Sequence, residues 1–326
     1  EIVKVPSDTP PGDNAPAAER ATDLLKGLGF EVEQHPVDSS YLAGYGMKSV
    51  TNLIVRHRFG PGGPTVALNA HGDVVPPGEG WTKPPYGAIV ENGRMYARGV
   101  AVSKSDFASF TYALLALKSL GLKTGALELH FTYDEEFGGL AGPAWLLERK
   151  LTKPDFVISA GFAYGIVTAH NGCLHLEVEL SGRSAHAAIP QSGSDALEAA
   201  TGVLAQLYNH RRELAQTKSR IAGIGTPQLT VGLISGGINT NVVPDRVVFR
   251  LDRRIIPEEN PETVERELRQ RIEAATAQHA GIACTVRRIL LAQPFMPVPG
   301  QERLVAAIDE HRDLDRAIEA LEANIP

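Results

Sequence analysis

The sequence predicts an α/β protein with a mainly parallel sheet and a second, smaller α+β layer. Short apolar strands alternate with helical patterns through the first half of the chain, which is typical of a sheet covered by helices on both faces. After Gly172 the order changes to strand, helix, strand, strand, helix, strand, as in a ferredoxin-like layer. The chain has 326 residues, of which 43% are hydrophobic, enough to form two cores.

Each element of the first half is predicted from its own periodicity. Apolar residues recur at helical spacing over residues 15–29, and Gly29 is a plausible end of that helix. A short apolar run over residues 64–70 predicts a buried strand that delivers His71 at its C-terminal end, where open α/β sheets bind ligands. Further strands are predicted at 30–35, 52–56, 93–99 and 126–132, and further helices at 106–120 and 143–151.

The second half predicts a separate domain inserted into the first. Its strands are expected at 173–180, 227–234, 246–252 and 282–290, and its helices at 196–212 and 261–279. We therefore expect residues 172–292 to form a lid or dimerisation domain, and residues 1–171 and 293–326 to form the catalytic domain. The tail has helical patterns at 304–311 and 314–321.

Composition restricts the classes of partner and compartment. The formal net charge of -6 and the lack of a Lys/Arg-rich run argue against nucleic acid or an anionic membrane as partner, and favour a small molecule or peptide. No apolar run reaches the roughly 18 residues that span a bilayer. Only Cys173 and Cys284 occur, which favours a reducing compartment, the cytoplasm. The first residues do not resemble a signal peptide, so we expect the chain to begin earlier.

Two short motifs suggest metal-assisted chemistry. His71 follows a predicted strand, and Asp73 stands two residues later. An imidazole there can bind a metal ion while the carboxylate fixes its tautomer and orientation. Glu135 and Glu136 follow a second predicted strand, and adjacent carboxylates offer one ligand and one general base. Each motif alone is compatible with an ordinary hydrogen-bonded or solvated loop.

These motifs, in this order and followed by the inserted layer, resemble the zinc-dependent exopeptidases and deacylases, the family that includes acetylornithine deacetylase, succinyl-diaminopimelate desuccinylase, aminoacylase and carboxypeptidase G. The resemblance covers nearly the whole chain. It implies a phosphorylase/hydrolase-like catalytic domain in which His71 binds the first metal and Asp73 holds the His71 ring. It also implies that Glu135 is the general base and that Glu136 binds the second metal.

The resemblance further implies a substrate and an assembly. His186, in Gly-Arg-Ser-Ala-His-Ala, would polarise the scissile carbonyl, often across a dimer, and Asn241 and Arg253 would meet the substrate carboxylate. The expected substrate is an N-acyl amino acid or a small peptide, and the expected cofactor is one or two zinc ions, with cobalt or manganese as substitutes. Asn241 and Arg253 have structural interpretations that are equally acceptable: a turn cap, and an ion pair with a neighbouring acid such as Glu258.

Three departures from the family pattern bear on the metal site. Val102 stands where Arg98-Gly99-x-x-Asp would place the metal-bridging aspartate. The stretch 158–164, where the family has an acidic ligand, contains no acid. Only 33 residues follow Gln293, and their one histidine, His311, lies in a charged helical pattern. The family's last histidine ligand is therefore unmatched, and we expect part of the C-terminal region to be missing.

These departures leave two hypotheses about function. The first is a metal-dependent amidohydrolase, in which Asp106, one helical turn after Val102, either substitutes for the missing carboxylate or acts as a helix N-cap. The second is a metal-poor relative that binds carboxylate ligands or serves as a dimeric scaffold. A serine hydrolase or nucleotide enzyme is disfavoured, because the sequence lacks Gly-x-Ser-x-Gly and a Gly-rich phosphate loop. His130, His170 and His175 are interpreted as core or sheet-face residues, and both cysteines as small buried hydrophobic residues.

Overall fold

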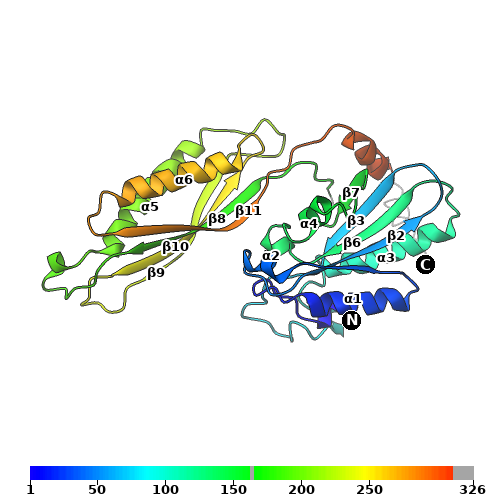
Figure 1. Ribbon diagram of the computed structural model, residues 1–326, viewed down its shortest axis with the longest axis horizontal. Coiled ribbons are helices and arrows are strands. Elements are labelled where there is room, and N and C mark those ends of the chain that lie inside the picture. Colours follow the sequence, from blue (N-terminus) through cyan, green and yellow to red (C-terminus); the bar gives the residue numbers. More distant parts are fainter. Residues whose placement is uncertain (162–164, 311–326) are drawn as a thin grey trace. The chain divides into compact units, whose positions relative to one another are not determined.

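The computed structural model describes residues 1–161 and 165–310, and it divides the chain into two compact units (Figure 1). Unit 1 comprises Glu1–Ile166 and the chain from Gly300 onward, and unit 2 comprises Val167–Pro299. The predicted helix at 314–321 and His311 lie outside the described residues, and residues 301–310 are helical. Within the described residues, no helix is both long enough and apolar enough to cross a membrane.

Unit 1 is built on a five-stranded mixed sheet in the order β1-β2-β6-β3-β7. Strand β2 is antiparallel to both β1 and β6, whereas β6, β3 and β7 pair in parallel. Four of the five strands therefore run in one direction, which confirms a mainly parallel sheet. The strands are β1 (Glu33–Pro36), β2 (Thr51–Arg58), β3 (Thr65–His71), β6 (Ala126–Thr132) and β7 (Phe156–Ser159).

The remaining elements of unit 1 differ from the sequence prediction mainly in their bounds. Helix α3 begins at Lys104, two residues earlier than predicted, and β1 covers only the end of the predicted strand. The sequence patterns did not predict α2, β4 or β7, because each is only three to five residues long. The other elements are η1 (Ile2–Lys4), α1 (Ala15–Gly27), α2 (Ser39–Ala43), β4 (Ile89–Glu91), β5 (Arg94–Tyr96), α3 (Lys104–Ser119), η2 (Glu135–Phe137) and α4 (Pro143–Glu148).

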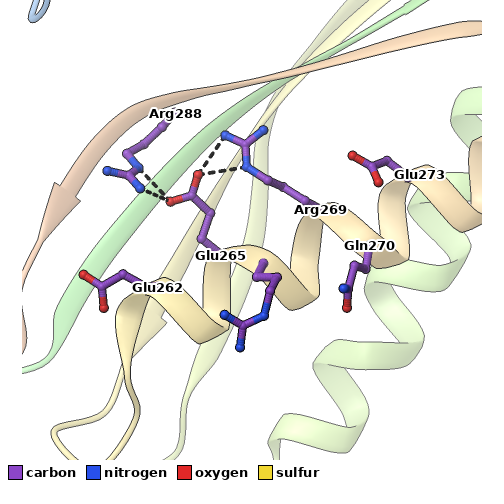
Figure 2. A pocket seen from close by; sticks show the side chains of 7 residues that line it. Glu262, Glu265, Arg269, Gln270, Glu273 and Arg288 are labelled. Atoms are coloured by element: carbon purple, nitrogen blue, oxygen red, sulfur yellow. Dashed lines mark hydrogen bonds and ion pairs between the residues drawn. The ribbon is translucent and has the colours of Figure 1, made fainter.

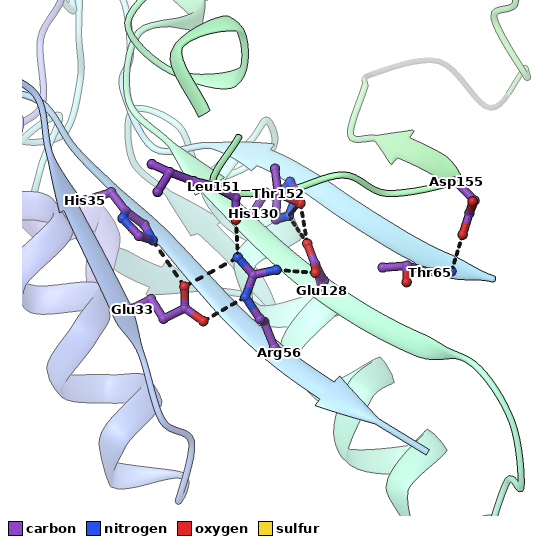
Figure 3. Close-up of polar contacts among 9 residues, drawn as sticks. All are labelled: Glu33, His35, Arg56, Thr65, Glu128, His130, Leu151, Thr152 and Asp155. Atoms are coloured by element: carbon purple, nitrogen blue, oxygen red, sulfur yellow. Dashed lines mark hydrogen bonds and ion pairs between the residues drawn. The ribbon is translucent and has the colours of Figure 1, made fainter. Parts of the chain in front are cut away.

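The central strand β6 is buried on both of its faces. On one face Phe131 stacks on Phe107 of α3, with 4.0 Å between the ring centroids. On the other face Glu128 and His130 contact the segment that follows α4, where the hydroxyl of Thr152 donates to Glu128 Oε2 at 2.5 Å (Figure 3). The alternation of a strand thus sends apolar side chains to the helix and polar ones to an internal network.

Arg56 of β2 closes this polar network across the sheet. Its guanidinium forms ion pairs with Glu128 of β6 and with Glu33 of β1, and it donates to the carbonyl of Leu151 (Figure 3). His130 lies 2.8 Å from Glu128. This partner identifies His130 as a satisfied sheet-face residue, as the sequence interpretation proposed.

Unit 2 follows the predicted βαββαβ order and forms a four-stranded antiparallel sheet, β11-β8-β10-β9. Leucine and valine side chains of β8 pack against helices α5 and α6, which share one face of the sheet. The elements are β8 (Gly172–Ser181), η3 (Pro190–Ser192), α5 (Ala196–Leu214), β9 (Gln228–Gly236), β10 (Arg246–Ile255), α6 (Pro261–Thr276) and β11 (Ala283–Ala292).

An ion-pair cluster joins α6 to the edge strand β11. Glu265 of α6 is buried and receives Arg269 from the next turn at 2.7 Å and Arg288 from β11 (Figure 2). Burial by itself raises the pKa of Glu265, but the two guanidinium groups outweigh it and lower that pKa. The cluster lines a hollow of about 380 Å³ whose other walls are polar. We interpret it as a structural contact between helix and sheet.

Candidate metal centre and active site

The site begins where two parallel strands end side by side. His71 is the last residue of β3 and is opposite Thr132, the last residue of β6. Beyond them, the backbone N–H of Gly72 donates to the carbonyl of Thr132 at 2.8 Å. The chain after β6 then forms the short helix η2, which carries Glu135 and Glu136. Because both strands are parallel, the residues that follow them meet at one edge of the sheet.

This edge brings three potential metal donors together. One donor atom from each of His71, Glu135 and Glu136 lies within 4.8 Å of the other two. The Nε2 atom of His71 is 3.9 Å from Glu135 Oε2. The His71 side chain is only 14% exposed, whereas that of Glu135 is 61% exposed. The arrangement therefore offers a largely buried imidazole and an accessible carboxylate around one point.

Asp73 holds these donors in position. Its side chain is fully buried, and its two carboxylate oxygens accept the backbone N–H groups of Glu135 at 3.2 Å and Glu136 at 2.9 Å. The carbonyl oxygen of Asp73 lies 3.0 Å from His71 Nδ1, and its Oδ1 lies 3.5 Å from the same nitrogen. One residue thus orients the imidazole and the loop that carries both glutamates.

The charges at this edge shift the pKa values of two donors. Burial lowers the pKa of His71, but Asp73 and then Glu135 outweigh burial and raise it to about 9. The pKa of Glu136 is raised by burial first, and further by the neighbouring charges of Glu135 and Asp73. Such a surplus of negative charge around a histidine is the environment that a cation stabilises.

Asp134 fixes the shape of the loop that carries Glu135 and Glu136. It is buried, and its Oδ2 accepts the backbone N–H of Ala141 at 2.5 Å. A Cβ atom on Gly142 would lie 2.1 Å from the other carboxylate oxygen, so only glycine fits there. Burial and the charge of Asp73 raise the pKa of Asp134 to about 7.

The start of helix α3 lies against His71. The backbone N–H of His71 donates to Ser103 Oγ at 3.1 Å, which places Val102 next to the site. The next residue, Lys104, is buried and donates to the carbonyl of Val5 at 3.0 Å, and burial lowers its pKa to about 8. Because Ser103 precedes the helix, Asp106 lies in the first turn and is not the N-cap. Among the described residues, Asp106 is also outside the donor cluster.

Residues 67–292 match the sequence pattern of peptidase family M20/M25/M40. The chain belongs to this family. A succinyl-diaminopimelate desuccinylase of Gluconobacter oxydans is 28% identical over 78% of this chain and 65% of its own length. An acetylornithine deacetylase of Myxococcus xanthus is 32% identical over 77% of this chain and 64% of its own length. The chain thus spans about two thirds of the length of these relatives.

Two solved structures share the fold. Human carnosine dipeptidase 1 superposes with a TM-score of 0.71 at 17% identity, covering 96% of this chain and 80% of that one. A dinuclear metal-binding peptidase of the family from Bacillus subtilis superposes with a TM-score of 0.55 at 18% identity, covering 91% of this chain and 72% of that one. At these identities the likeness concerns the fold.

The other predicted site residues of this family M20 chain lie in unit 2. His186 pairs with Val242 in an isolated antiparallel bridge, and the backbone N–H of Ala187 donates to the carbonyl of Asn241 at 2.9 Å. The structure therefore brings His186 and Asn241 to neighbouring backbone segments. Both side chains are exposed. His186 Nδ1 accepts the N–H of Ala188 at 3.1 Å, so a neutral ring carries its proton on Nε2.

The Arg253 side chain is buried, whereas a residue that binds a ligand must be accessible. Its side chain is buried on the helix face of β10 and pairs with Glu259. This placement supports the structural interpretation, although the partner is Glu259 rather than Glu258. The next residue, Arg254, faces the opposite side of the sheet and is half exposed. Neighbouring arginines on a strand point to opposite faces, and the sequence alone did not show which face is the core.

Proposed function

We propose that this protein is a metal-dependent hydrolase that cleaves the amide bond of an N-acyl amino acid or a small peptide. The observation that carries the proposal is the convergence of His71, Glu135 and Glu136 on one point, with Asp73 behind them. Family membership supplies the class of reaction. The curated relatives named above are a desuccinylase and a deacetylase, which both act on N-acylated amino groups.

The donor set among the described residues fits one divalent ion better than two. His71 and Glu136 are the proposed protein ligands, and a zinc ion with about four ligands would take its remaining ligands from water and substrate. Zinc is the proposed metal, with cobalt or manganese as substitutes. Bound there, the ion would polarise the scissile carbonyl and lower the pKa of water. Val102 offers no donor to bridge a second ion.

Glu135 is the proposed general base. Its carboxylate is the most exposed of the three donors and lies beside the His71 imidazole, so it can reach a water molecule and remove its proton. It then returns that proton to the leaving amine, as a base in amide hydrolysis must. Asp73 keeps Glu135 in place through the backbone N–H rather than through the side chain, which leaves the carboxylate free to react.

His186 is the proposed donor to the carbonyl oxygen. The N–H of Ala188 occupies Nδ1, so the neutral ring presents Nε2–H as a hydrogen-bond donor, the group that steadies a developing oxyanion. Asn241 is the proposed contact of the substrate carboxylate. Arg253, the second predicted contact, is buried against Glu259, and its half-exposed neighbour Arg254 is paired with Asp252 at 3.0 Å, so Asn241 is the only carboxylate contact that we propose.

We propose that unit 2 is the lid and dimerisation domain, inserted into the catalytic domain at about residues 172–292. The βαββαβ order and four-stranded antiparallel sheet support a ferredoxin-like layer. A homodimer formed through this layer and a cytoplasmic location complete the proposal. Both cysteines are free, which agrees with a reducing compartment.

The hydrolase proposal is tested by replacing Glu135 with Ala and Gln in the full chain. Hydrolysis of a panel of N-acetyl and N-succinyl amino acids and dipeptides is measured with zinc, cobalt or manganese added. Loss of a general base lowers the rate by about 10²–10⁴-fold, and both variants should do so while unfolding as the parent does. Glu79→Ala, an exposed glutamate in the loop after His71, is the matched control and should keep full activity.

The alternative function is a metal-poor protein that binds carboxylate ligands, and Val102 at the bridging position is the observation that favours it. The same proteins, assayed with and without metal, distinguish the hydrolase from the metal-poor binding protein. If no substrate of the panel is hydrolysed with any metal, while an N-acyl amino acid binds equally well before and after chelation, the alternative holds and the hydrolase proposal is wrong.

A further inference from the structure

The face of the unit 2 sheet opposite α5 and α6 carries a second cluster of metal-ligating side chains. On β8 the core-facing residues are leucines and valine, so Cys173 and His175 stand two residues apart on the other face. Asp252 of the neighbouring strand β10 is directly opposite His175 in the register. One donor atom from each of the three lies within 4.8 Å of the other two.

The distances within this cluster match the edges of a tetrahedral site. Cys173 Sγ is 3.1 Å from His175 Nε2 and 3.8 Å from Asp252 Oδ1, and His175 Nε2 is 3.3 Å from Asp252 Oδ2. Bonds of about 2.3 Å from zinc to sulfur and about 2.0 Å to nitrogen or oxygen give ligand–ligand edges of roughly 3.3–3.5 Å. The thiol, the imidazole and the two carboxylate oxygens thus lie within a few tenths of an ångström of the spacing that one ion requires, without a change in the strands.

Cys173 and Asp252 both approach the same imidazole nitrogen, Nε2 of His175, which argues against a nucleophilic triad. In a Cys-His-Asp triad the thiol and the carboxylate contact different nitrogens of the imidazole. Here the sulfur and the carboxylate both approach Nε2, which carries at most one proton and cannot donate fully to both. A convergence of three electron-rich atoms on one point is the geometry of a cation site.

The surroundings leave room for an ion and supply a route to it. Cys173 is buried, but His175 and Asp252 line a hollow of about 580 Å³ on this face of the sheet. Arg254 holds Asp252 Oδ2 at 3.0 Å, as an outer group that orients a ligand does. Glu177, the next acid along β8, is occupied by Arg250 and Arg287 at 2.7 Å each, so it is not a further ligand.

We propose that Cys173, His175 and Asp252 form a mononuclear site for a zinc-type divalent ion, with water from the hollow as the fourth ligand. The thiolate and imidazole select zinc or cobalt over magnesium or calcium, which prefer oxygen donors. The site is separate from the proposed His71 centre and does not depend on the hydrolase proposal. Its two strands, β8 and β10, are neighbours in the sheet, so the ion would clamp them at one end.

Cobalt titration of the reduced full chain tests this site, because only a sulfur ligand gives the thiolate-to-cobalt absorption of the near ultraviolet. The His71 cluster contains no sulfur, so it is silent in this band. We expect a band that saturates at one cobalt per chain, is lost in Cys173→Ser and is unchanged in His71→Ala. Cys284→Ser removes the other cysteine and is the matched control; it should keep the band.

Two further variants keep the test decisive if Cys173→Ser does not fold. His175→Ala and Asp252→Asn leave the thiol in place and should shift the titration to higher cobalt concentration. Zinc should also protect Cys173, but not Cys284, from alkylation, as located by mass spectrometry. The proposal is overturned if the parent protein shows no band, if Cys284→Ser removes it, or if both ligand variants titrate as the parent does.

Discussion

Glu136 donates its backbone N–H to Oδ2 of the buried Asp73 at 2.9 Å, and the N–H of Glu135 donates to Oδ1 of the same carboxylate at 3.2 Å. The carbonyl oxygen of Asp73 is 3.0 Å from the ring nitrogen of His71. A single residue, two positions after the end of β3, therefore determines where the imidazole and the loop with Glu135 and Glu136 lie. Metal affinity should depend on Asp73 although it is not one of the proposed ligands.

Asp73→Asn is expected to weaken metal binding about 10–100-fold and to lower the free energy of unfolding by about 1–3 kcal/mol. An amide keeps one acceptor oxygen but turns an N–H donor toward one of the two backbone N–H groups, so the glutamate loop must move. Calorimetric titration with zinc measures the affinity, and urea unfolding measures the stability.

Asp155→Asn is the matched control for Asp73→Asn. Asp155 accepts the backbone N–H of Thr65 at 2.8 Å, at the opposite end of β3 (Figure 3). Its replacement affects the same strand without touching the site, so zinc affinity should stay unchanged. If Asp73→Asn binds zinc as tightly as the parent, the orienting role assigned to Asp73 is wrong.

The sequence was sufficient for the order of the longer helices and strands and for the residues that meet at His71. Strands β3 and β6 have apolar runs followed directly by polar motifs, and parallel neighbours must place those motifs together. The family resemblance added the roles of Glu135 and Glu136, which their positions alone do not distinguish.

Other features depend on contacts that are remote in sequence. The Asp73 carboxylate accepts the backbone N–H of Glu136, and no pattern of side chains in the sequence predicts that hydrogen bond. Arg253 and Arg254 could be assigned to opposite faces by alternation, but only the structure shows that Arg253 faces Glu259 in the core. Cys173 and His175 are two residues apart, which places them on one face of a strand. Their partner Asp252 lies far away in the sequence, on β10, so the cluster can be recognised only from the register of β10 against β8.

The pH dependence of stability should show a carboxylate with a strongly lowered pKa at Glu128. Burial raises the pKa of Glu128, but His130, Thr152 and Arg56 outweigh burial and lower it to about 2. The folded value lies below the value of about 4.3 in an unfolded chain. The stabilisation is therefore complete above about pH 4.5 and is lost as the pH falls toward 2. Urea unfolding from pH 7 to pH 2 measures this loss.

Glu128→Gln should remove this pH dependence and lower the free energy of unfolding at pH 7 by about 1–3 kcal/mol. The control is Glu33→Gln, which removes the other carboxylate that pairs with Arg56 (Figure 3). Glu33 is 45% exposed, so its loss should change stability by less than about 1 kcal/mol. Equal effects of the two variants would contradict the assignment of the internal network to Glu128.

Metal content should be well below two ions at the His71 centre, because Val102 supplies no carboxylate. An ion held by His71 and Glu136 keeps mostly water ligands, so a chelator should remove it readily. To count this centre alone, the measurement uses a Cys173→Ser background and elemental analysis after dialysis. Two zinc ions per chain in that background would show that Asp106 or another group completes the site.

Val102→Asp is expected to tighten metal binding at that centre. Ser103 accepts the backbone N–H of His71, so residue 102 lies near the His71 main chain, and Val102 is only partly buried, which leaves space for a carboxylate. Calorimetric titration of zinc into the variant should give a higher affinity or a second equivalent. Val102→Asn has the same shape without the charge and is the control. Equal titrations of all three proteins would mean that residue 102 does not face the ion.

Dimerisation should use the β9 edge of the unit 2 sheet rather than the β11 edge. Strand β9 contains no charged residue or proline, the usual protections of an exposed edge, and Leu233 and Ile234 are 61% and 53% exposed. Strand β11 carries Arg287 and Arg288, which are paired with Glu177 and Glu265. A second copy paired along β9 would satisfy the free edge and cover both apolar side chains.

Sedimentation at micromolar concentration should therefore show a dimer that Ile234→Lys dissociates. Burying one such side chain contributes about 1.5–3 kcal/mol, so removing the Ile234 side chain from the interface should raise the dimer Kd by about 10- to 100-fold. Thr285→Lys places the same charge on the exposed face of β11 and is the matched control, because the β11 edge is not expected to take part. A monomeric parent protein would contradict the dimer, and dissociation by Thr285→Lys alone would move the interface to β11.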